Sequence, residues 1–431
     1  MSEIVCSLRL FRELLLIVHR GEQATVRFGV QRTPSGPCYL LRSPPRVEGA
    51  PERSEPPRPQ DAGTTSAPHP PADRDSLFYV MGIGGGSSRL VPWLVPPIAG
   101  LLILGRGEHQ GEIWATAQTE DGSDPIERIA LVGAGMHDIV LSGGGEPPLP
   151  GAPDVEAWSR TIGALGGEGV WRRLCGLSVA VVGCGRSGSL MAEAIARLGV
   201  ERLVLIDGDA LERTNLGEMA LVGREDVGRP KAVALKERLS SSCPHTAVDA
   251  LTMPITHTAA LRRAATARVL VCCVDNDAAR LSAGVLAACY HQVLIDVGTA
   301  VVPPDQAGAA RLRADVRIVL PDEGCILCSG GLTDHRRAVQ DLCRPGSHAE
   351  PQDQFGTQRA GSLRSLNQLA GSVALRLLED LVSGRITSSR WAHLELDERG
   401  QLAVTYPEIG PVPGCTLCQK GGLGDASGLT W

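Results

Sequence analysis

Residues 177–188 read Leu-Ser-Val-Ala-Val-Val-Gly-Cys-Gly-Arg-Ser-Gly, and this stretch decides the fold class of most of the chain. Its first six residues form a short apolar run, which is typical of a buried strand. The glycines Gly183, Gly185 and Gly188 allow a tight turn and let the backbone approach a phosphate closely where a helix begins. The stretch therefore predicts a strand that ends at a phosphate-binding turn.

The residues that follow extend this stretch into a sheet. A helix is expected over residues 189–198, and the apolar run 202–206 predicts a second strand. Strand, turn, helix and strand form a βαβ unit, and apolar runs at 269–274 and 293–297 predict further strands. The sequence thus predicts an α/β fold with a Rossmann-like, mainly parallel sheet, followed by an amphipathic helix over residues 362–381.

Asp207 follows the second strand, where an acidic side chain can accept hydrogen bonds from the hydroxyl groups of a ribose. A glycine turn followed by such an acid also occurs in ordinary nicotinamide dehydrogenases. These two features predict a nucleotide-binding protein but leave its chemistry open.

Four further motifs favour one family. They are Asp207-Gly-Asp209, Thr214-Asn215-Leu216, Asp226-Val-Gly-Arg-Pro-Lys231, and Val274-Asp275-Asn276 with Arg280. Their order and spacing resemble those of the ubiquitin-activating-type adenylyltransferases, the ThiF/MoeB/HesA superfamily. The resemblance covers about residues 155–420. A dehydrogenase has no need of this lysine and asparagine after its second strand.

The resemblance implies ATP-dependent adenylation of a carboxylate and a role for each motif residue. Lys231 would bind phosphates, Asn215 would orient them, Asp275 would bind Mg²⁺ and act in catalysis, Asp207 would bind the ribose, and Asp209 and the three turn glycines would complete the nucleotide site. Trp158-Ser-Arg160 resembles the family's Y-S-R-Q element, whose arginine reaches the ATP of a partner subunit. Arg160 would therefore act catalytically in a homodimer. The competing interpretation of Lys231 is a solvated lysine that opens a helix.

Glu218 departs from the family pattern. The family usually has N-L-x-R-Q where this chain has Asn215-Leu-Gly-Glu218, so an acid stands at the position of a phosphate-binding arginine. A carboxylate repels a triphosphate. We expect Arg213, Arg229 or Arg186 to compensate, or turnover to be slower.

Two C-x-x-C motifs predict a structural zinc site. Cys325-Ile-Leu-Cys328 and Cys415-Thr-Leu-Cys418 supply four thiolates for tetrahedral Zn²⁺ and leave no open position for catalysis. The family resemblance implies the same two-motif site on either side of the last helix. The alternative is two unrelated motifs or redox pairs.

Cys343 is the candidate acceptor of a thioester, because ubiquitin-like activation often continues to a cysteine. It begins the polar segment 343–361, where the superfamily has a mobile crossover loop that carries a reactive cysteine in several members. Arg336, Arg337 and Arg344 could lower the pKa of its thiol. A plain loop cysteine is the competing interpretation. Cys272, Cys273 and Cys289 lie in apolar runs and are expected in the core.

Residues 1–148 are predicted to form a smaller α/β domain, and residues 149–431 the adenylation domain. Segment 43–75 is dense in Pro, Arg, Glu and Ser and predicts a disordered insert. The first domain bears a fainter resemblance to JAB/MPN-type domains. No His, Asp or Glu occurs between Leu77 and Arg106, so the zinc ligands of an active JAB enzyme are missing. We expect either an inactive JAB-like domain or an unrelated α/β domain.

The composition limits the kinds of partner and the cellular compartment that are expected. A net charge of −6 argues against a broad nucleic-acid-binding surface, and no apolar run is long enough to cross a membrane. The 13 cysteines of a long chain without an export signal indicate reduced thiols and a cytoplasmic protein.

The predicted function is adenylation of the C-terminal glycine of a ubiquitin-like protein, followed by transfer to a cysteine thiol, in a bacterial conjugation pathway that has a conjugating enzyme as a further partner. One alternative is a sulfur-carrier adenylyltransferase of the MoeB/ThiF kind. The other is a non-catalytic scaffold that binds the ubiquitin-like protein.

Overall fold

The computed structural model describes residues 2–19, 23–33, 36–48, 76–83, 98–106, 113–119, 122–140, 154–302, 311–342 and 363–427. The chain divides into two compact units. The first unit comprises Met1–Leu131, Asp138–Gly145 and Gly422–Ala426, and the second comprises Val132–His137, Glu146–Gly421 and Ser427–Trp431. The two units are not separated at a single point in the sequence, because a short segment near the C-terminus belongs to the first unit.

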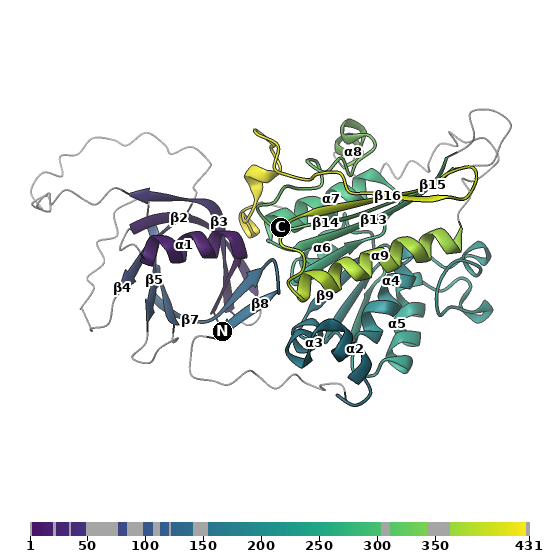
Figure 1. Ribbon diagram of the computed structural model, residues 1–431, viewed down its shortest axis with the longest axis horizontal. Helices are drawn as coiled ribbons and strands as arrows, with labels where there is room; N and C mark the ends of the chain where they lie inside the picture. Colours follow the sequence, from purple (N-terminus) through teal and green to yellow (C-terminus); the bar gives the residue numbers. More distant parts are fainter. Residues whose placement is uncertain are drawn as a thin grey trace, which may run out of the picture. The chain divides into compact units, whose positions relative to one another are not determined.

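The first unit is built on an eight-stranded sheet with the order β1-β3-β2-β4-β5-β6-β7-β8, and β1 also pairs with β7. Its elements are β1 (Ser2–Ser7), α1 (Leu8–His19), β2 (Gln23–Thr33), β3 (Gly36–Glu48), β4 (Ser76–Ile83), β5 (Ile98–Arg106), β6 (Ile113–Thr119), β7 (Gly122–Val132) and β8 (His137–Val140) (Figure 1). Leu10, Phe11 and Leu14 form the buried face of α1, and they pack into one core with Val26, Phe28 and Tyr39.

Strand β3 corrects the predicted insert 43–75. Residues 43–48 belong to this strand, and Arg46, Val47 and Glu48 pair with β2. The register shifts between Thr25 and Arg27 of β2, opposite Pro44 and Pro45, which lack the N–H group that a regular ladder needs. A bulge therefore accommodates the prolines that made this segment read as disordered. Residues 49–75 lie outside the described residues, and so do residues 84–86 of the glycine turn at 80–86, whereas the first four residues of that turn belong to β4.

The C-terminal segment Gly422–Ala426 is packed tightly into the first unit. Gly424 forms a parallel bridge with Val30, and Asp425 Oδ2 accepts a hydrogen bond from Arg32 N at 2.8 Å. A Cβ atom on Gly29 would lie 2.2 Å from the carbonyl oxygen of Gly422. The backbones approach this closely only because position 29 is glycine.

The second unit confirms the predicted α/β class. Its eight-stranded sheet has the order β11-β10-β9-β12-β13-β14-β15-β16. The first five strands in this order are parallel, and β14, β15 and β16 continue the sheet antiparallel. The strands are β9 (Ser178–Val182), β10 (Arg202–Ile206), β11 (Ala247–Leu251), β12 (Val269–Cys272), β13 (Val293–Val302), β14 (Arg311–Val319), β15 (Arg390–Leu396) and β16 (Leu402–Thr405).

Helices cover the parallel part of this sheet on both faces, and α4 and α9 lie on the side opposite to α7 (Figure 1). The helices are α2 (Ser159–Leu165), α3 (Glu168–Cys175), α4 (Arg186–Arg197), α5 (Lys231–Ser242), α6 (Thr258–Ala264), α7 (Asp277–Cys289), α8 (His335–Leu342) and α9 (Arg364–Val382), with short 3₁₀ turns η1 (Arg213–Asn215), η2 (Arg224–Asp226) and η3 (Cys418–Lys420). The 3₁₀ turn η4 (Asp425–Ser427) begins in the segment that belongs to the first unit. Small buried residues such as Ala192 on α4 and Ala370 and Gly371 on α9 let these two helices pack closely. Within the described residues, no helix combines the length and apolar character that crossing a bilayer requires.

Candidate active site

A pocket of about 890 Å³ lies at the carboxyl ends of the parallel strands of the second unit. Val182, Ile206 and Cys272 are register partners at the ends of β9, β10 and β12, so the loops that follow these strands meet at one edge. The pocket volume lies within the range of small-molecule and cofactor sites. Open α/β sheets bind ligands at this edge.

The glycine turn after β9 forms one wall of the pocket. A Cβ atom on Gly188 would lie 1.7 Å from the carbonyl oxygen of Gly183, and one on Gly183 would lie 2.8 Å from that of Cys273. Gly183 also has a φ angle of 84°, in the left-handed region. A Cβ atom on Gly185 would meet no atom within 4 Å, because this residue borders the pocket. Two glycines are thus required by packing, and the third leaves space for a ligand.

Asp207 ties the glycine turn to the end of β10. Its two carboxylate oxygens accept hydrogen bonds from Cys184 N at 2.6 Å and from Asp209 N at 2.8 Å. Burial raises the pKa of Asp207, and these backbone donors together with the charge of Lys231 act in the opposite direction. The side chain lines the pocket, at the position predicted for a ribose ligand.

Lys231, which begins α5, lines the same pocket. Its Nζ donates to Asp209 Oδ2 at 2.8 Å, and its backbone N donates to Asp209 O at 2.9 Å. Burial opposes its charge, but Asp209, Asp207 and Asp275 together raise the pKa of Lys231. The side chain is 13% exposed, so this lysine is not the solvated residue of the competing interpretation.

Asn215 also borders the pocket, from the 3₁₀ turn η1. Its Oδ1 accepts a hydrogen bond from Glu212 N at 2.8 Å, which caps the turn and fixes the amide plane. With the oxygen engaged in this way, the amide nitrogen is the group that can donate to a ligand.

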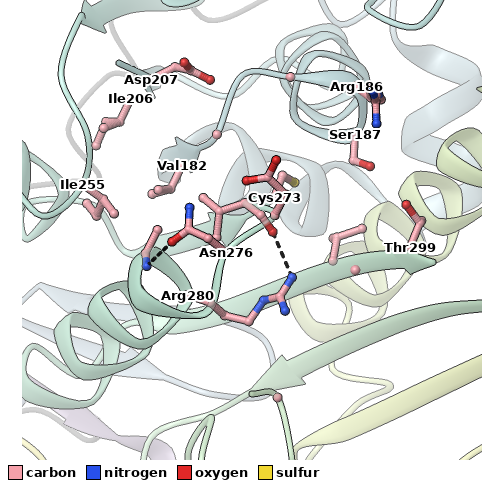
Figure 2. A pocket seen from close by; sticks show the side chains of 18 of the residues that line it. Val182, Arg186, Ser187, Ile206, Asp207, Ile255, Cys273, Asn276, Arg280 and Thr299 are labelled. Atoms are coloured by element: carbon pink, nitrogen blue, oxygen red, sulfur yellow. Dashed lines mark hydrogen bonds between the residues drawn. The ribbon is translucent and has the colours of Figure 1, made fainter. Parts of the chain in front are cut away.

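Asp275 follows β12, and the residues after it hold its loop in place (Figure 2). Asn276 Oδ1 caps α7 by accepting from Ala279 N at 2.8 Å. Arg280 Nη2 donates to Val274 O at 2.9 Å, and its Nε lies 2.9 Å from Asp296 Oδ1. Both interactions orient the loop so that Asp275 lines the pocket.

A buried ion network at the far end of the pocket was not foreseen from the sequence. Arg317 Nη1 lies 3.2 Å from Asp296 Oδ2, and the guanidinium stacks 4.3 Å from the ring centroid of Trp391. Asp315 Oδ1 accepts from Trp391 Nε1 at 2.7 Å. Burial raises the pKa of Asp296, while Arg280 and Arg317 oppose the shift. The alternation of charged residues along β14 is the sequence signal that could have indicated a polar sheet face.

Five residues predicted for the site do not line the pocket: Arg160, Gly188, Arg213, Glu218 and Arg229. Arg160 lies on the exposed side of α2, so a role at an active site would require the ATP of another subunit. Arg229 is held by Asp226 at 3.0 Å and by Glu237 at 2.6 Å. Glu218 Oε2 accepts a hydrogen bond from Asn367 Nδ2 at 3.4 Å.

The two C-x-x-C motifs form one cluster. The Sγ atoms of Cys325, Cys328, Cys415 and Cys418 all lie within 4.8 Å of one another. The Cys325–Cys415 and Cys328–Cys418 separations are both 3.5 Å, close to the about 3.8 Å expected between sulfurs of a tetrahedral site with 2.3 Å Zn–S bonds. A hydrogen bond from Cys418 lowers the pKa of Cys325 to about 5, whereas burial raises the pKa of Cys328. The donor set fits Zn²⁺.

Outside this cluster, the described cysteines are buried, except for Cys273, which is partly exposed. Cys272 and Cys289 are buried in the core, as predicted, and Cys273 lines the pocket. Burial raises the pKa of Cys272 to about 12 and that of Cys184 well above its usual value. Cys343 follows the last residue of α8 and lies outside the described residues.

Comparison with known proteins agrees with this geometry. The model of the ThiF family matches residues 158–411, which is more than half of the chain. The chain belongs to the ThiF family. Its ThiF region therefore includes the glycine turn, the Lys231 loop, the Asp275 loop and the first C-x-x-C motif.

Several curated proteins resemble parts of this region. The tRNA threonylcarbamoyladenosine dehydratase of Bacillus subtilis is 40% identical over 99 residues, covering 23% of this chain and 39% of that protein. The sulfur carrier protein ThiS adenylyltransferase of Escherichia coli is 30% identical over 167 residues, covering 38% of this chain and 61% of that protein. The chain thus spans less than two thirds of the length of each of these two relatives. The structure of E. coli MccB with ATP has a TM-score of 0.48 and 19% identity, covering 62% of this chain and 76% of that one.

Proposed function

We propose that this protein is an ATP-dependent adenylyltransferase that activates the C-terminal carboxylate of a ubiquitin-like or sulfur-carrier protein. The observation that carries the proposal is one pocket lined by residues that follow three neighbouring strands. The glycine turn follows β9, Asp207 and the largely buried Lys231 follow β10, and Asp275 follows β12. Membership of the ThiF family and the names of its adenylyltransferase relatives support it.

The reaction joins two anions, so the site must lower their repulsion. A carboxylate oxygen attacks the α-phosphorus of ATP, a new O–P bond forms, and the bond to the β-phosphate breaks as pyrophosphate leaves. Lys231 neutralises charge on the phosphates, and Asn215 donates a hydrogen bond from its amide nitrogen to a phosphate oxygen. Asp207 accepts hydrogen bonds from the ribose hydroxyl groups. Asp275 would hold Mg²⁺, which supplies further positive charge when bound.

Asp207 keeps acceptor capacity for the ribose although it already accepts two backbone hydrogen bonds. A carboxylate has about four lone-pair positions, so two remain for hydroxyl donors. The backbone bonds also hold the carboxylate rigid, which reduces the entropy lost when the nucleotide binds.

The more specific part of the proposal concerns the carrier. We favour a glycine-ended ubiquitin-like protein in a bacterial conjugation pathway, with a conjugating enzyme as a further partner. The proposal also includes a cytoplasmic homodimer in which Arg160 of one subunit acts at the ATP of the other. The N-terminal unit would serve as a docking domain, either an inactive JAB-like domain or an unrelated α/β domain.

We further propose that the cluster of Cys325, Cys328, Cys415 and Cys418 holds a structural Zn²⁺. Four thiolates complete a tetrahedral shell, so no coordination position remains for a water nucleophile. Cys325 and Cys415 are 90 residues apart in sequence, so the metal would tie the C-terminal part of the chain to the segment after β14.

ATP–pyrophosphate exchange tests the proposed function. Wild-type protein with Mg²⁺ is combined with glycine-ended ubiquitin-like proteins, sulfur-carrier proteins, or tRNA that carries threonylcarbamoyladenosine. We expect exchange that requires a carrier protein and falls at least about 100-fold in Asp275→Ala, because the metal ligand is lost. Exchange only with the tRNA would contradict the carrier proposal. No exchange with any substrate by a folded protein would support the scaffold alternative.

A sulfur-carrier adenylyltransferase is the second candidate, because the ThiS adenylyltransferase match extends over 61% of that relative. The two candidates differ after adenylation. In the first, a cysteine thiolate attacks the acyl carbon, forms a thioester and releases AMP.

For the thioester, we expect wild-type protein to form a reductant-sensitive adduct with the carrier on non-reducing gels. Cys343→Ser should remove the adduct while ATP–pyrophosphate exchange stays within about twofold of wild type, since the thiol acts only after the exchange step. An adduct that persists in Cys343→Ser would exclude this cysteine as the acceptor. Full sulfur transfer without any adduct would favour the second candidate.

A further inference from the structure

The pocket holds equal numbers of acidic and basic side chains, so its ability to bind a polyanion depends on which cations are already paired. The acidic residues are Asp207, Asp209, Asp275 and Asp315, and the basic residues are Arg186, Lys231, Arg280 and Arg317. A nucleoside triphosphate adds several negative charges. A cation whose charge is balanced by a neighbouring carboxylate contributes less to such a ligand.

Three of the four cations have protein partners. Arg280 and Arg317 share the fully buried Asp296, at 2.9 Å and 3.2 Å. If either arginine moved away, the buried carboxylate of Asp296 would lose one of the two cations that balance its charge, which is unfavourable. Lys231 pairs with Asp209, which is 74% exposed, so this pair can open at low cost when a phosphate competes for the lysine.

Arg186 is the exception. It is the first residue of α4, its side chain is exposed, and it lies between Gly185 and Ser187, which also line the pocket. Among the residues that the structure describes, no carboxylate forms an ion pair with it. Figure 2 shows Arg186 and Asp207 on opposite sides of the pocket, so the two residues can contact different parts of one elongated ligand.

The hydrogen bonds of Asn367, next to Arg186, give Glu218 a structural role. Asn367 of α9 is 1% exposed, and its Oδ1 accepts from Thr299 Oγ1 at 2.9 Å and from Ser187 Oγ at 3.2 Å. Its Nδ2 donates to Glu218 Oε2 at 3.4 Å. The carboxylate of Glu218 therefore satisfies a buried amide and helps to hold the turn that carries Arg186.

We infer that Arg186 is a catalytic residue that contacts the phosphates of ATP and stabilises the departing pyrophosphate. This inference rests on the proposed function. The guanidinium presents a planar set of N–H donors that matches phosphate oxygens in pairs. It also stands beside the N-terminal N–H groups of α4, which favour an anion at the same place. The turn residue thus replaces the cation that Glu218 removes.

The test compares Arg186→Gln with wild type and with Arg197→Gln, a matched control on an exposed arginine at the other end of the same helix and outside the pocket. Binding of ATP, pyrophosphate and AMP is measured by calorimetry with Mg²⁺, and ATP–pyrophosphate exchange is measured with the carrier. We expect Arg186→Gln to lose about 100-fold in exchange and at least about 10-fold in affinity for ATP and pyrophosphate, with AMP unchanged. Arg186→Lys should recover part of the loss, because it restores the charge but not the paired donors.

The selective loss for pyrophosphate-bearing ligands separates a phosphate contact from a general structural defect, which would also weaken AMP binding. Wild-type exchange in Arg186→Gln, or equal weakening of ATP and AMP, overturns the inference. If the wild type binds ATP but catalyses no exchange, the proposed function fails, and the ATP affinity of Arg186→Gln still decides the role of Arg186.

Discussion

Lys231→Ala should lower ATP–pyrophosphate exchange by about 100- to 1,000-fold, the usual cost of removing one preorganised group that stabilises transition-state charge. Lys231 has a largely buried stem, begins α5, and is fixed through its backbone by the loop at Asp209. Asp209, Asp207 and Asp275 raise the pKa of Lys231 despite its burial, so the ammonium form persists above neutral pH. The charge is therefore present where the phosphates would lie.

The measurement is steady-state exchange at saturating carrier, with the melting temperature recorded for each variant. Lys236→Ala is the matched control, because Lys236 lies on the same helix but does not line the pocket. We expect Lys236→Ala to behave as wild type and Lys231→Ala to keep its melting temperature within a few degrees. If Lys231→Ala loses less than about threefold, this lysine does not act on the phosphates.

Removing two of the clustered thiols should have the largest effect on stability. The double variant Cys415→Ser/Cys418→Ser should retain no stoichiometric zinc and should melt at least about 10 °C lower than wild type. Structural zinc contributes directly to folding free energy, and each kcal/mol lost shifts the melting temperature of a unit this large by about 2–4 °C. The four sulfurs already converge, so metal loss leaves thiols that repel one another when ionised.

Zinc content by elemental analysis and thermal unfolding followed by circular dichroism check this result. Cys343→Ser serves as the control, because it removes one thiol outside the cluster and should keep one zinc per chain. A double variant that melts like wild type would contradict a structural role. A wild-type protein purified without zinc, and not stabilised by its addition, would contradict the metal assignment itself.

The parallel part of the sheet in the second unit could be predicted from the sequence, because its pattern depends on residues that are close together along the chain. Its strands are short apolar runs, and residues in the loops that follow them are constrained by turn geometry and hydrogen bonds. Gly188 is an example, because no other residue fits within 1.7 Å of the Gly183 carbonyl oxygen. The spacing from Asp209 to Lys231 similarly reflects a backbone hydrogen bond between these two residues. Such constraints fix residue types and spacings, so they can be recognised in the sequence.

The antiparallel strands β14, β15 and β16 were not foreseen, and neither was the network built on them. Asp296 and Arg317 lie opposite each other on β13 and β14, and Trp391 comes from β15, which is much further along the chain. Their pairing depends on the register of the sheet. Strand β3 was missed in part because a bulge accommodates Pro44 and Pro45. Register and bulges depend on the neighbouring strand, which the local sequence does not specify.

The sequence by itself determined the α/β class, the glycine turn, the acids and the lysine that line the pocket, and the two cysteine pairs. These features depend on residue type and on short spacings, which backbone geometry translates directly into structure. Only the tertiary structure decided which arginine is available. Arg229 is held by Asp226 and Glu237, whereas Arg186 borders the pocket without such a partner among the described residues. Whether a charged side chain is paired depends on which residues the tertiary fold brings next to it. The sequence of one segment does not specify those neighbours.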